Sequence, residues 1–124
     1  MNNKNEYRVL VCGGRNYNNI NMVYKVLCSV LSCCRNKGYT LVIIQGGAKG
    51  ADHLAEKWAE ANNIKSITFK ADWDKYSKAA GAIRNQNMLN LSNPNLVIAF
   101  PGGNGTKDMI NRAKTAQIDI LPIV

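Results

Sequence analysis

The sequence has 124 residues, enough for a single domain spanning residues 1–124, and no stretch of it approaches the roughly 18 apolar residues of a membrane helix. Its first residues lack the apolar core of a signal peptide, so we expect a soluble, cytoplasmic protein with no membrane partner. Sixteen Lys and Arg against eight Asp and Glu give a net charge of +8, which favours an anionic partner such as a nucleotide or a nucleic acid.

Apolar, strand-like runs alternate with amphipathic helical segments along the chain. After a leader of residues 1–5 that we expect to be frayed, the pattern predicts a strand at 7–12, a helix at 21–36, a strand at 40–45, a helix at 51–62 and a strand at 64–69. Residues 70–81 are expected to form a polar loop or broken segment, followed by a helix at 82–91, a strand at 95–100, a helix at 106–116 and a strand at 118–124. Pro122 interrupts this last strand, which suits the edge of a sheet.

The predicted strands are apolar along their whole length, which is typical of a sheet that is covered on both faces. Together with the alternating helices, they predict an α/β fold, a three-layer sandwich with a mainly parallel five-stranded sheet and helices on both faces. The apolar side of the helix at 21–36, from Met22 to Leu31, offers an interface for a homodimer or a higher homo-oligomer.

The four cysteines, Cys12, Cys28, Cys33 and Cys34, contain no C-x-x-C pair, and the chain has a single histidine. This pattern provides no zinc ligand set, so we predict no metal site and no cofactor. Free cysteine packs as a small hydrophobe, and we expect these thiols to be reduced and mostly buried.

Three predicted strands each end in a glycine pair: Gly13-Gly14, Gly46-Gly47 and Gly102-Gly103. The carboxyl ends of parallel strands meet at one edge of a sheet, and ligands bind there. Glycine lets backbone N–H groups approach an anion, and the helix that follows directs its positive end to the same place. One such pair is explained equally well by a tight turn, but three pairs at one edge favour an anion site.

Polar and charged residues beside these pairs are candidate ligand contacts. Asn104, Gly105 and Thr106 open a helix after the third pair, and the Thr106 hydroxyl can cap that helix or donate to a phosphate. Arg15 follows the first pair directly, and Arg84 lies near the start of the helix at 82–91. A guanidinium group suits a phosphate, so both arginines are predicted to neutralise the ligand.

Asp52 follows the second glycine pair, where its carboxylate can either cap the helix start or bind a ribose hydroxyl. Lys49, in the same loop, is a candidate phosphate contact. Trp73 and Tyr76 can stack on a base or pack over the sheet. His53 is the lone histidine, one turn into a helix, which favours a packed or surface role over catalysis.

These motifs, taken in order, resemble the SLOG superfamily and its small YspA-like branch. The matching segments are Gly13-Gly14-Arg15, residues 45–52, Trp58-Ala59, Ala71-Asp72-Trp73, Ala80-Gly81, Arg84-Asn85, Met88 and residues 99–106. They cover nearly the whole chain. The resemblance implies a Rossmann-like three-layer sandwich and a nucleotide-type ligand, with Asn85 joining the binding residues, but it does not define an activity.

Two related families suggest different activities. The LOG enzymes cleave the bond between a base and ribose 5′-phosphate, and they carry the motifs P-G-G-x-G-T-x-x-E and R-K-x-x-M. Residues 101–106 match the first motif and Arg84 with Met88 match the second, but Met109 stands at the catalytic glutamate position and Asn85 at the lysine position. Cleavage would therefore need Asp108, with Arg84, or Asp52 in place of that glutamate.

The leading hypothesis is that the protein binds a nucleotide or a nucleotide derivative, of the 5′-phosphate or ADP-ribose type, with phosphoribohydrolase-like cleavage as an accompanying activity. A second hypothesis is a sensor or sequestering protein for a signalling nucleotide, which suits an accessory role in a phage or mobile element. A third is a single-stranded DNA-binding module, because residues 46–52 resemble the glycine-rich loop of the DNA-processing protein A family.

Overall fold

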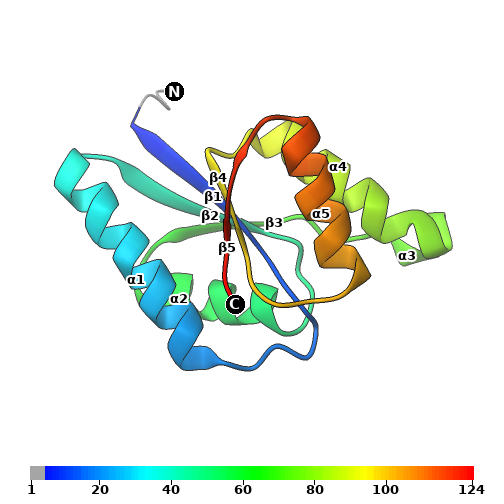
Figure 1. The fold of residues 1–124 in the computed structure, drawn as a ribbon, viewed down its shortest axis with the longest axis horizontal. Helices are drawn as coiled ribbons and strands as arrows, with labels where there is room; N and C mark the ends of the chain where they lie inside the picture. Colours follow the sequence, from blue (N-terminus) through cyan, green and yellow to red (C-terminus); the bar gives the residue numbers. More distant parts are fainter. Residues whose placement is uncertain (1–4) are drawn as a thin grey trace.

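The computed structural model describes residues 5–124 and contains a five-stranded sheet, parallel throughout, with the strand order β3-β2-β1-β4-β5. Figure 1 shows its elements: β1 (Glu6–Cys12), α1 (Ile20–Lys37), β2 (Thr40–Gln45), α2 (Ala51–Ala61), β3 (Lys65–Thr68), α3 (Trp73–Tyr76), the 3-10 helix η1 (Ser77–Ala79), α4 (Ala80–Ser92), β4 (Leu96–Ala99), α5 (Asn104–Thr115) and β5 (Asp119–Pro122).

Helices cover both faces of the sheet, α1 and α2 on one side and α4 and α5 on the other (Figure 1). Side chains alternate along each strand, so Val9 and Val11 of β1 pack against α1 and α2 while Leu10 and Cys12 pack against α4 and α5. The predicted α/β fold, a Rossmann-like three-layer sandwich, is confirmed.

The direction in which strands are added reverses at the centre of the sheet. From β1 the chain adds β2 and β3 on one side, then crosses back to add β4 and β5 on the other. β1 therefore has β2 and β4 as neighbours, and Cys12, its last residue, is level with Ala99 of β4. Such a reversal leaves a crevice at the carboxyl ends of the two central strands, where ligands bind in sheets of this type.

Helix α1 buries its apolar side within its own chain. The Asn19 side chain caps its start by accepting from Met22 N–H at 3.0 Å, and Gly38 ends it in the left-handed region with φ of 75°. Val23, Leu27 and other buried residues of the helix pack on the sheet. Met22, Val26 and Val30 are only partly buried, and a homo-oligomer that uses this helix stays a prediction.

Two segments differ from the sequence-based prediction. Of the leader expected to be frayed, residues 1–4 lie outside the described residues, but Asn5 is held in place because its carbonyl accepts from Thr40 N–H at 2.7 Å. The segment at 70–81 is a broken segment, one of the two expected alternatives, and contains α3 and η1, but α4 starts at Ala80 rather than at residue 82. Pro122 does lie in the edge strand, as predicted.

The cysteines are free thiols, but the expectation that they are mostly buried is wrong for half of them. Cys12 and Cys34 are buried, whereas Cys28 and Cys33 are exposed. The apolar stripe of α1 that faces the sheet runs through Val23, Leu27, Leu31 and Cys34, which leaves the other two at the outer side. Cys28 nevertheless has a role in packing, because its sulfur accepts from the indole N–H of Trp58 at 3.3 Å.

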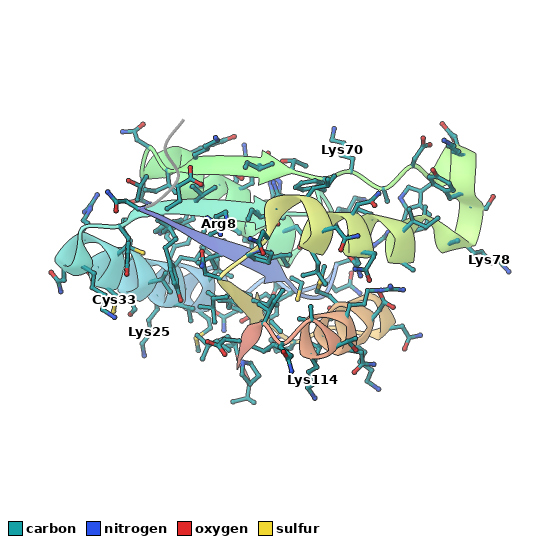
Figure 2. All side chains as sticks on the ribbon, turned by 90° about the horizontal axis from the view of Figure 1, so that it is seen from above. Arg8, Lys25, Cys33, Lys70, Lys78 and Lys114 are labelled. Atoms are coloured by element: carbon teal, nitrogen blue, oxygen red, sulfur yellow. The ribbon has the colours of Figure 1, made fainter. Side chains whose placement is uncertain are left out.

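The positive charge is spread around the molecule. Figure 2 shows Lys70 on one side, Lys25 and Lys114 on the opposite side, and Lys78 of η1 at the far end, and all four are exposed. Among residues 5–124, no helix has the length and apolar character needed to cross a membrane.

Candidate functional site

The carboxyl ends of β1, β2 and β4 bring three glycine-rich segments together: the β1 loop (residues 13–15), the β2 loop (residues 46–50) and the β4 turn (residues 101–106). Gly14 N–H donates to the Pro101 carbonyl at 2.9 Å, and Ala51 N–H donates to the Gly14 carbonyl at 3.2 Å. A Cβ on Gly102 would lie 2.6 Å from Gly14 N and collide with the Thr106 hydroxyl. The three segments therefore pack as one unit.

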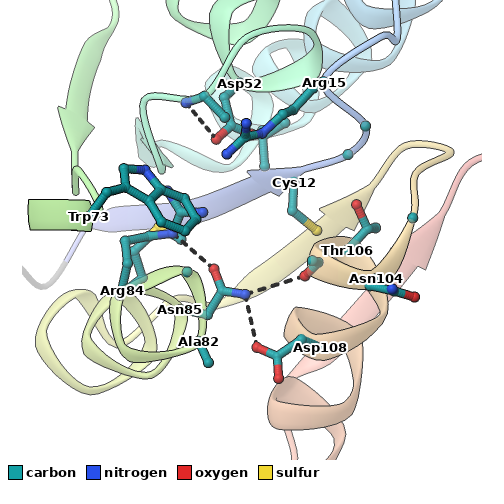
Figure 3. A pocket seen from close by; sticks show the side chains of 18 of the residues that line it. Cys12, Arg15, Asp52, Trp73, Ala82, Arg84, Asn85, Asn104, Thr106 and Asp108 are labelled. Atoms are coloured by element: carbon teal, nitrogen blue, oxygen red, sulfur yellow. Dashed lines mark hydrogen bonds between the residues drawn. The ribbon is translucent and has the colours of Figure 1, made fainter. Parts of the chain in front are cut away.

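A cavity of about 640 Å³ opens between these segments and α4 (Figure 3). This volume is within the usual range for small-molecule sites. The cavity lies at the carboxyl end of the central strands, where the order of strands reverses.

The β2 loop is closed by a carboxylate from its own chain. Asp52 Oδ2 accepts from Gly46 N–H at 3.0 Å and from Ala48 N–H at 3.3 Å, and the residue is 5% exposed. Burial raises the pKa of Asp52 to about 6, although these N–H groups and the charges of Arg84 and Arg15 act in the opposite direction. Of the two roles left open by the sequence, capping does not fit, since Gly50 is the N-cap of α2 and Asp52 bonds to the loop before it.

Arg84 of α4 closes the same loop from the other side. Its Nη1 donates to the Gly46 carbonyl at 2.6 Å and its Nε donates to Asn85 Oδ1 at 3.0 Å. Gly46 must be a glycine for this approach, because a Cβ there would lie 2.7 Å from the Arg84 Cζ atom. Burial lowers the pKa of Arg84 while the charge of Asp52 opposes this, and the guanidinium stays protonated.

A polar network continues from Arg84 to α5. The amide of Asn85, 5% exposed, donates from Nδ2 to Asp108 Oδ2 at 3.0 Å and to the Gly105 carbonyl at 3.3 Å (Figure 3). Asp108 Oδ2 also accepts from Arg112 Nε at 2.8 Å. Partial burial raises the pKa of Asp108, but the hydrogen bonds from Arg112 and Asn85 and the charge of Arg112 outweigh it and hold this pKa below its ordinary value. Asp108 is therefore a carboxylate at neutral pH.

The β4 turn, in contrast, has backbone donors beside the cavity that no capping side chain fills. The N-cap of α5 is Gly103, which has no side chain to cap the helix. Backbone N–H groups of a first helical turn, here those of Asn104, Gly105 and Thr106, have no acceptor within the helix. Gly103 and these three residues line the cavity, so the positive end of α5 faces it.

The far side of the cavity is aromatic and basic. Trp73 of α3 lines it, and the Arg15 Cζ atom lies over the indole ring, 5.5 Å from the ring centroid. Lys78 of η1 is a further lining residue. Trp73 is 48% exposed, so the alternative that it packs over the sheet is wrong.

A model of the YspA, cpYpsA-related SLOG family matches residues 7–76, more than half of the chain. The chain belongs to this family. The match includes the β1 loop, the β2 loop and α3, and it ends before the β4 turn. The curated Gene 61 protein of Mycobacterium phage D29 is 33% identical over 121 residues, which cover 92% of this chain and 94% of that protein.

Solved structures share the fold of this SLOG domain. DNA processing protein A (DprA) from Streptococcus pneumoniae superposes with a TM-score of 0.76 at 22% identity, over 95% of this chain and 50% of that one. The crystal structure of TM1055 superposes with a TM-score of 0.67 at 15% identity, over 92% of this chain and 72% of that one. At these identities the likeness concerns the fold.

Most of the predicted site residues of this SLOG domain line one cavity. They are Gly13, Gly14, Arg15, Asp52, Arg84, Asn85, Gly103, Asn104, Gly105, Thr106 and Asp108. Four do not line it: Gly102 and Gly46 hold neighbouring segments close together, and Gly47 and Lys49 are exposed on the outer side of the β2 loop. His53 is exposed on α2, in agreement with a surface role.

Some lining residues of the SLOG domain were not predicted as part of the site. Lys78 lies in a segment without clear periodicity, and Ala82 begins the predicted helix at 82–91, so the position of both at the cavity depends on how α3 and η1 fold back. Cys12 ends β1 and faces the cavity (Figure 3), and burial followed by the charge of Asp52 raises the pKa of its thiol to about 12 despite Arg84. Among residues 5–124, no three His, Cys, Asp or Glu side chains gather as metal ligands.

Proposed function

We propose that this protein binds a nucleotide or nucleotide derivative by its phosphate, with the phosphate at the β4 turn. One observation supports this most strongly: the N-terminus of α5 is capped by a glycine and its first turn lines a cavity of about 640 Å³. Such a helix end is a ready anion site, because its N–H groups and its dipole both favour negative charge.

The charges around the cavity suit an anionic ligand. Hydrogen bonds to the Gly46 carbonyl and to Asn85 hold the Arg84 guanidinium in place, so its positive charge stays at the cavity. Arg15 and Lys78 add two exposed cations on the far side. In this proposal Gly103, Gly105 and Thr106 bind the phosphate, and Asp108 faces the ribose.

Cleavage of the bond between base and ribose is the accompanying reaction that we propose to test. Asp108 lines the cavity as a carboxylate, so it would act as a base that takes a proton from water. The water oxygen would bond to ribose C1′ while the C1′–N bond breaks, and the proton taken by Asp108 would pass to the leaving base, which restores the carboxylate. Met109, at the glutamate position of the LOG motif, is fully buried in the core and takes no part.

A single-stranded DNA-binding role is less well supported. DprA shares the fold, and its name refers to DNA processing, but the exposed lysines labelled in Figure 2 lie on different sides of the molecule rather than along one groove. A strand binder needs a basic groove with aromatic platforms along it.

The test is mass spectrometry of the protein incubated with 5′-nucleotides and ADP-ribose derivatives, with bound and free fractions separated first. Intact ligand retained on the protein supports binding or sequestration, and free base with ribose phosphate establishes cleavage. We expect Arg84→Ala to lower affinity about tenfold to a hundredfold, since a charged hydrogen-bonding group is lost, and Lys114→Ala, a distant exposed cation, to change nothing.

Asp108→Asn separates the two activities. We expect it to abolish release of base while leaving binding within a few-fold. Equal turnover would remove Asp108 from the reaction. If every compound stays free and unchanged, the proposal is wrong, and binding of oligonucleotides that falls steeply with salt would then favour nucleic acid.

A further inference from the structure

Trp73 is an exposed aromatic residue at the cavity. The chain has two tryptophans: Trp58 is fully buried against the sheet, whereas Trp73 is 48% exposed. Figure 3 shows Trp73 across the cavity from Asn104 and Thr106, the residues of the β4 turn. A tryptophan buries on the order of 200 Å² when it packs fully, so leaving half of it in water forgoes stabilisation that folding alone would favour.

Local contacts fix where the indole lies. The Asp72 side chain caps α3 by accepting from Lys75 N–H at 3.1 Å, which sets the start of this short helix. At the first turn of α4, Gly81 adjoins the ring, and a Cβ there would lie 3.5 Å from the Trp73 Cη2 atom. The indole is therefore held beside α4 and over the cavity.

A cationic group already lies over this ring. The Arg15 guanidinium lies over it, 5.5 Å from the centroid to Cζ, and Arg15 is exposed. Guanidinium groups and nucleobases are both flat and both stack on indole. Because an exposed arginine is free to move, a base can take its place on the ring.

The number of glycine-rich loops that are free to bind an anion limits the number of phosphate groups that the ligand can carry. The β2 loop has the same glycine-rich character as the β4 turn, but Asp52 already occupies its Gly46 and Ala48 N–H groups. At the β4 turn the first residues of α5 line the cavity, and no capping side chain occupies the N–H groups of this helix end. This arrangement suits a single phosphate group at one end of the ligand.

We propose that Trp73 determines specificity, by stacking on the base of a nucleoside 5′-monophosphate whose phosphate lies at the β4 turn. This inference rests on the proposed function of that turn. It predicts that the base and the phosphate are recognised by separate groups on opposite sides of the cavity. Trp73 then contributes affinity only to ligands that carry a base.

The experiment compares the four nucleoside 5′-monophosphates with ribose 5-phosphate, which lacks the base. Affinities are measured by calorimetry, and tryptophan fluorescence reports stacking, because buried Trp58 gives a constant background. The variants are Trp73→Ala, Trp73→Phe and Tyr76→Ala. The last is a matched control, because Tyr76 is a half-exposed aromatic residue of the same helix whose ring lies under Lys75.

We expect at least one nucleoside monophosphate to quench the wild-type fluorescence and ribose 5-phosphate to bind without quenching. Trp73→Ala should weaken nucleotide binding about tenfold or more and leave ribose 5-phosphate unchanged, since stacking on one base is worth that much. Trp73→Phe should retain nucleotide affinity within a few-fold and lose the quenching. Tyr76→Ala should match the wild type.

Two results overturn the inference in different ways. If Trp73→Ala lowers the affinities for nucleotide and for ribose 5-phosphate equally, or lowers neither, Trp73 does not bind the base. The proposed phosphate site is not affected by that result. If neither the nucleotides nor ribose 5-phosphate bind the wild type, the proposed function fails and this inference fails with it.

Discussion

The β2 loop and the β4 turn have similar sequences, but the N–H groups of one are filled by a side chain and those of the other are open. Both follow a buried parallel strand, both contain a glycine pair, and both lead into a helix whose N-cap is a glycine. The β2 loop is filled by Asp52, which accepts from Gly46 and Ala48 N–H groups, and is covered by Arg84. The β4 turn leaves its donors facing the cavity.

The two loops show the difference between a glycine-rich loop that is filled by a carboxylate of the same chain and one that is open to a ligand. In the β2 loop the chain supplies its own carboxylate, so the loop is a rigid wall that holds Arg84 in position. In the β4 turn the corresponding charge has to come from outside the chain. Glycine content alone therefore does not identify a phosphate site, and the position of the nearest carboxylate decides between the two cases.

The largest effect is expected from removing the acceptor that fills the β2 loop. Asp52→Ala leaves the N–H groups of Gly46 and Ala48 without their partner, whereas Asp52→Asn keeps an oxygen at the same place. We expect the alanine variant to be less stable than the asparagine variant by about 2–4 kcal/mol in urea unfolding. Equal stability would show that the loop does not depend on this acceptor.

A smaller effect is expected from the charge of the same side chain. The pKa of Asp52 rises from 3.8 to about 6 on folding, so the folded protein binds this proton more tightly than the unfolded chain. Its stabilising contribution is therefore complete below about pH 4 and is lost as the pH rises through about 6. Asp52→Asn removes this titration.

We expect the wild type to lose about 2–3 kcal/mol of stability relative to Asp52→Asn between about pH 4 and about pH 7. Unfolding by urea at four pH values measures this difference directly. Parallel curves for the two proteins would mean that Asp52 titrates at its ordinary pKa and that burial does not penalise its charge.

The smallest effect is expected at the β4 turn, and on binding rather than stability. A Cβ on Gly103 would meet no atom within 4 Å, so Gly103→Ala should fold with stability within about 0.5 kcal/mol of the wild type. Its methyl group would stand where we place the phosphate, and we expect affinity for a nucleotide to fall about tenfold by calorimetry.

The same substitution in the β2 loop should do the reverse. A Cβ on Gly46 would collide with Arg84 and lie 3.0 Å from Asp52 Oδ2, so Gly46→Ala should destabilise the fold. If Gly103→Ala bound nucleotide as well as the wild type did, the β4 turn would not contact the phosphate. The difference between the filled β2 loop and the open β4 turn would then not explain where the ligand binds.

Much of the fold was predictable because its signal is local. Runs such as 7–12 and 40–45 are apolar on both faces, and only a parallel sheet covered on both sides buries them. Residues 70–81 were not predictable in detail, because α3 and η1 are a few residues long and show no periodicity. The exposure of Trp73 depends on how that segment folds back.

The sequence by itself determined the sheet, its edge strand and the meeting of three glycine pairs at one edge, because strand patterning and parallel connections leave few alternatives. Only the tertiary structure decided which loop is filled. Asp52 and Asp108 each lie in the first turns of a helix that follows a glycine pair, and both line the cavity. Asp52 accepts from backbone N–H groups of the β2 loop, whereas Asp108 accepts from the side chains of Asn85 and Arg112. That difference depends on which groups of β1 and α4 pack beside each loop, and contacts between segments far apart in the chain leave no local trace in the sequence.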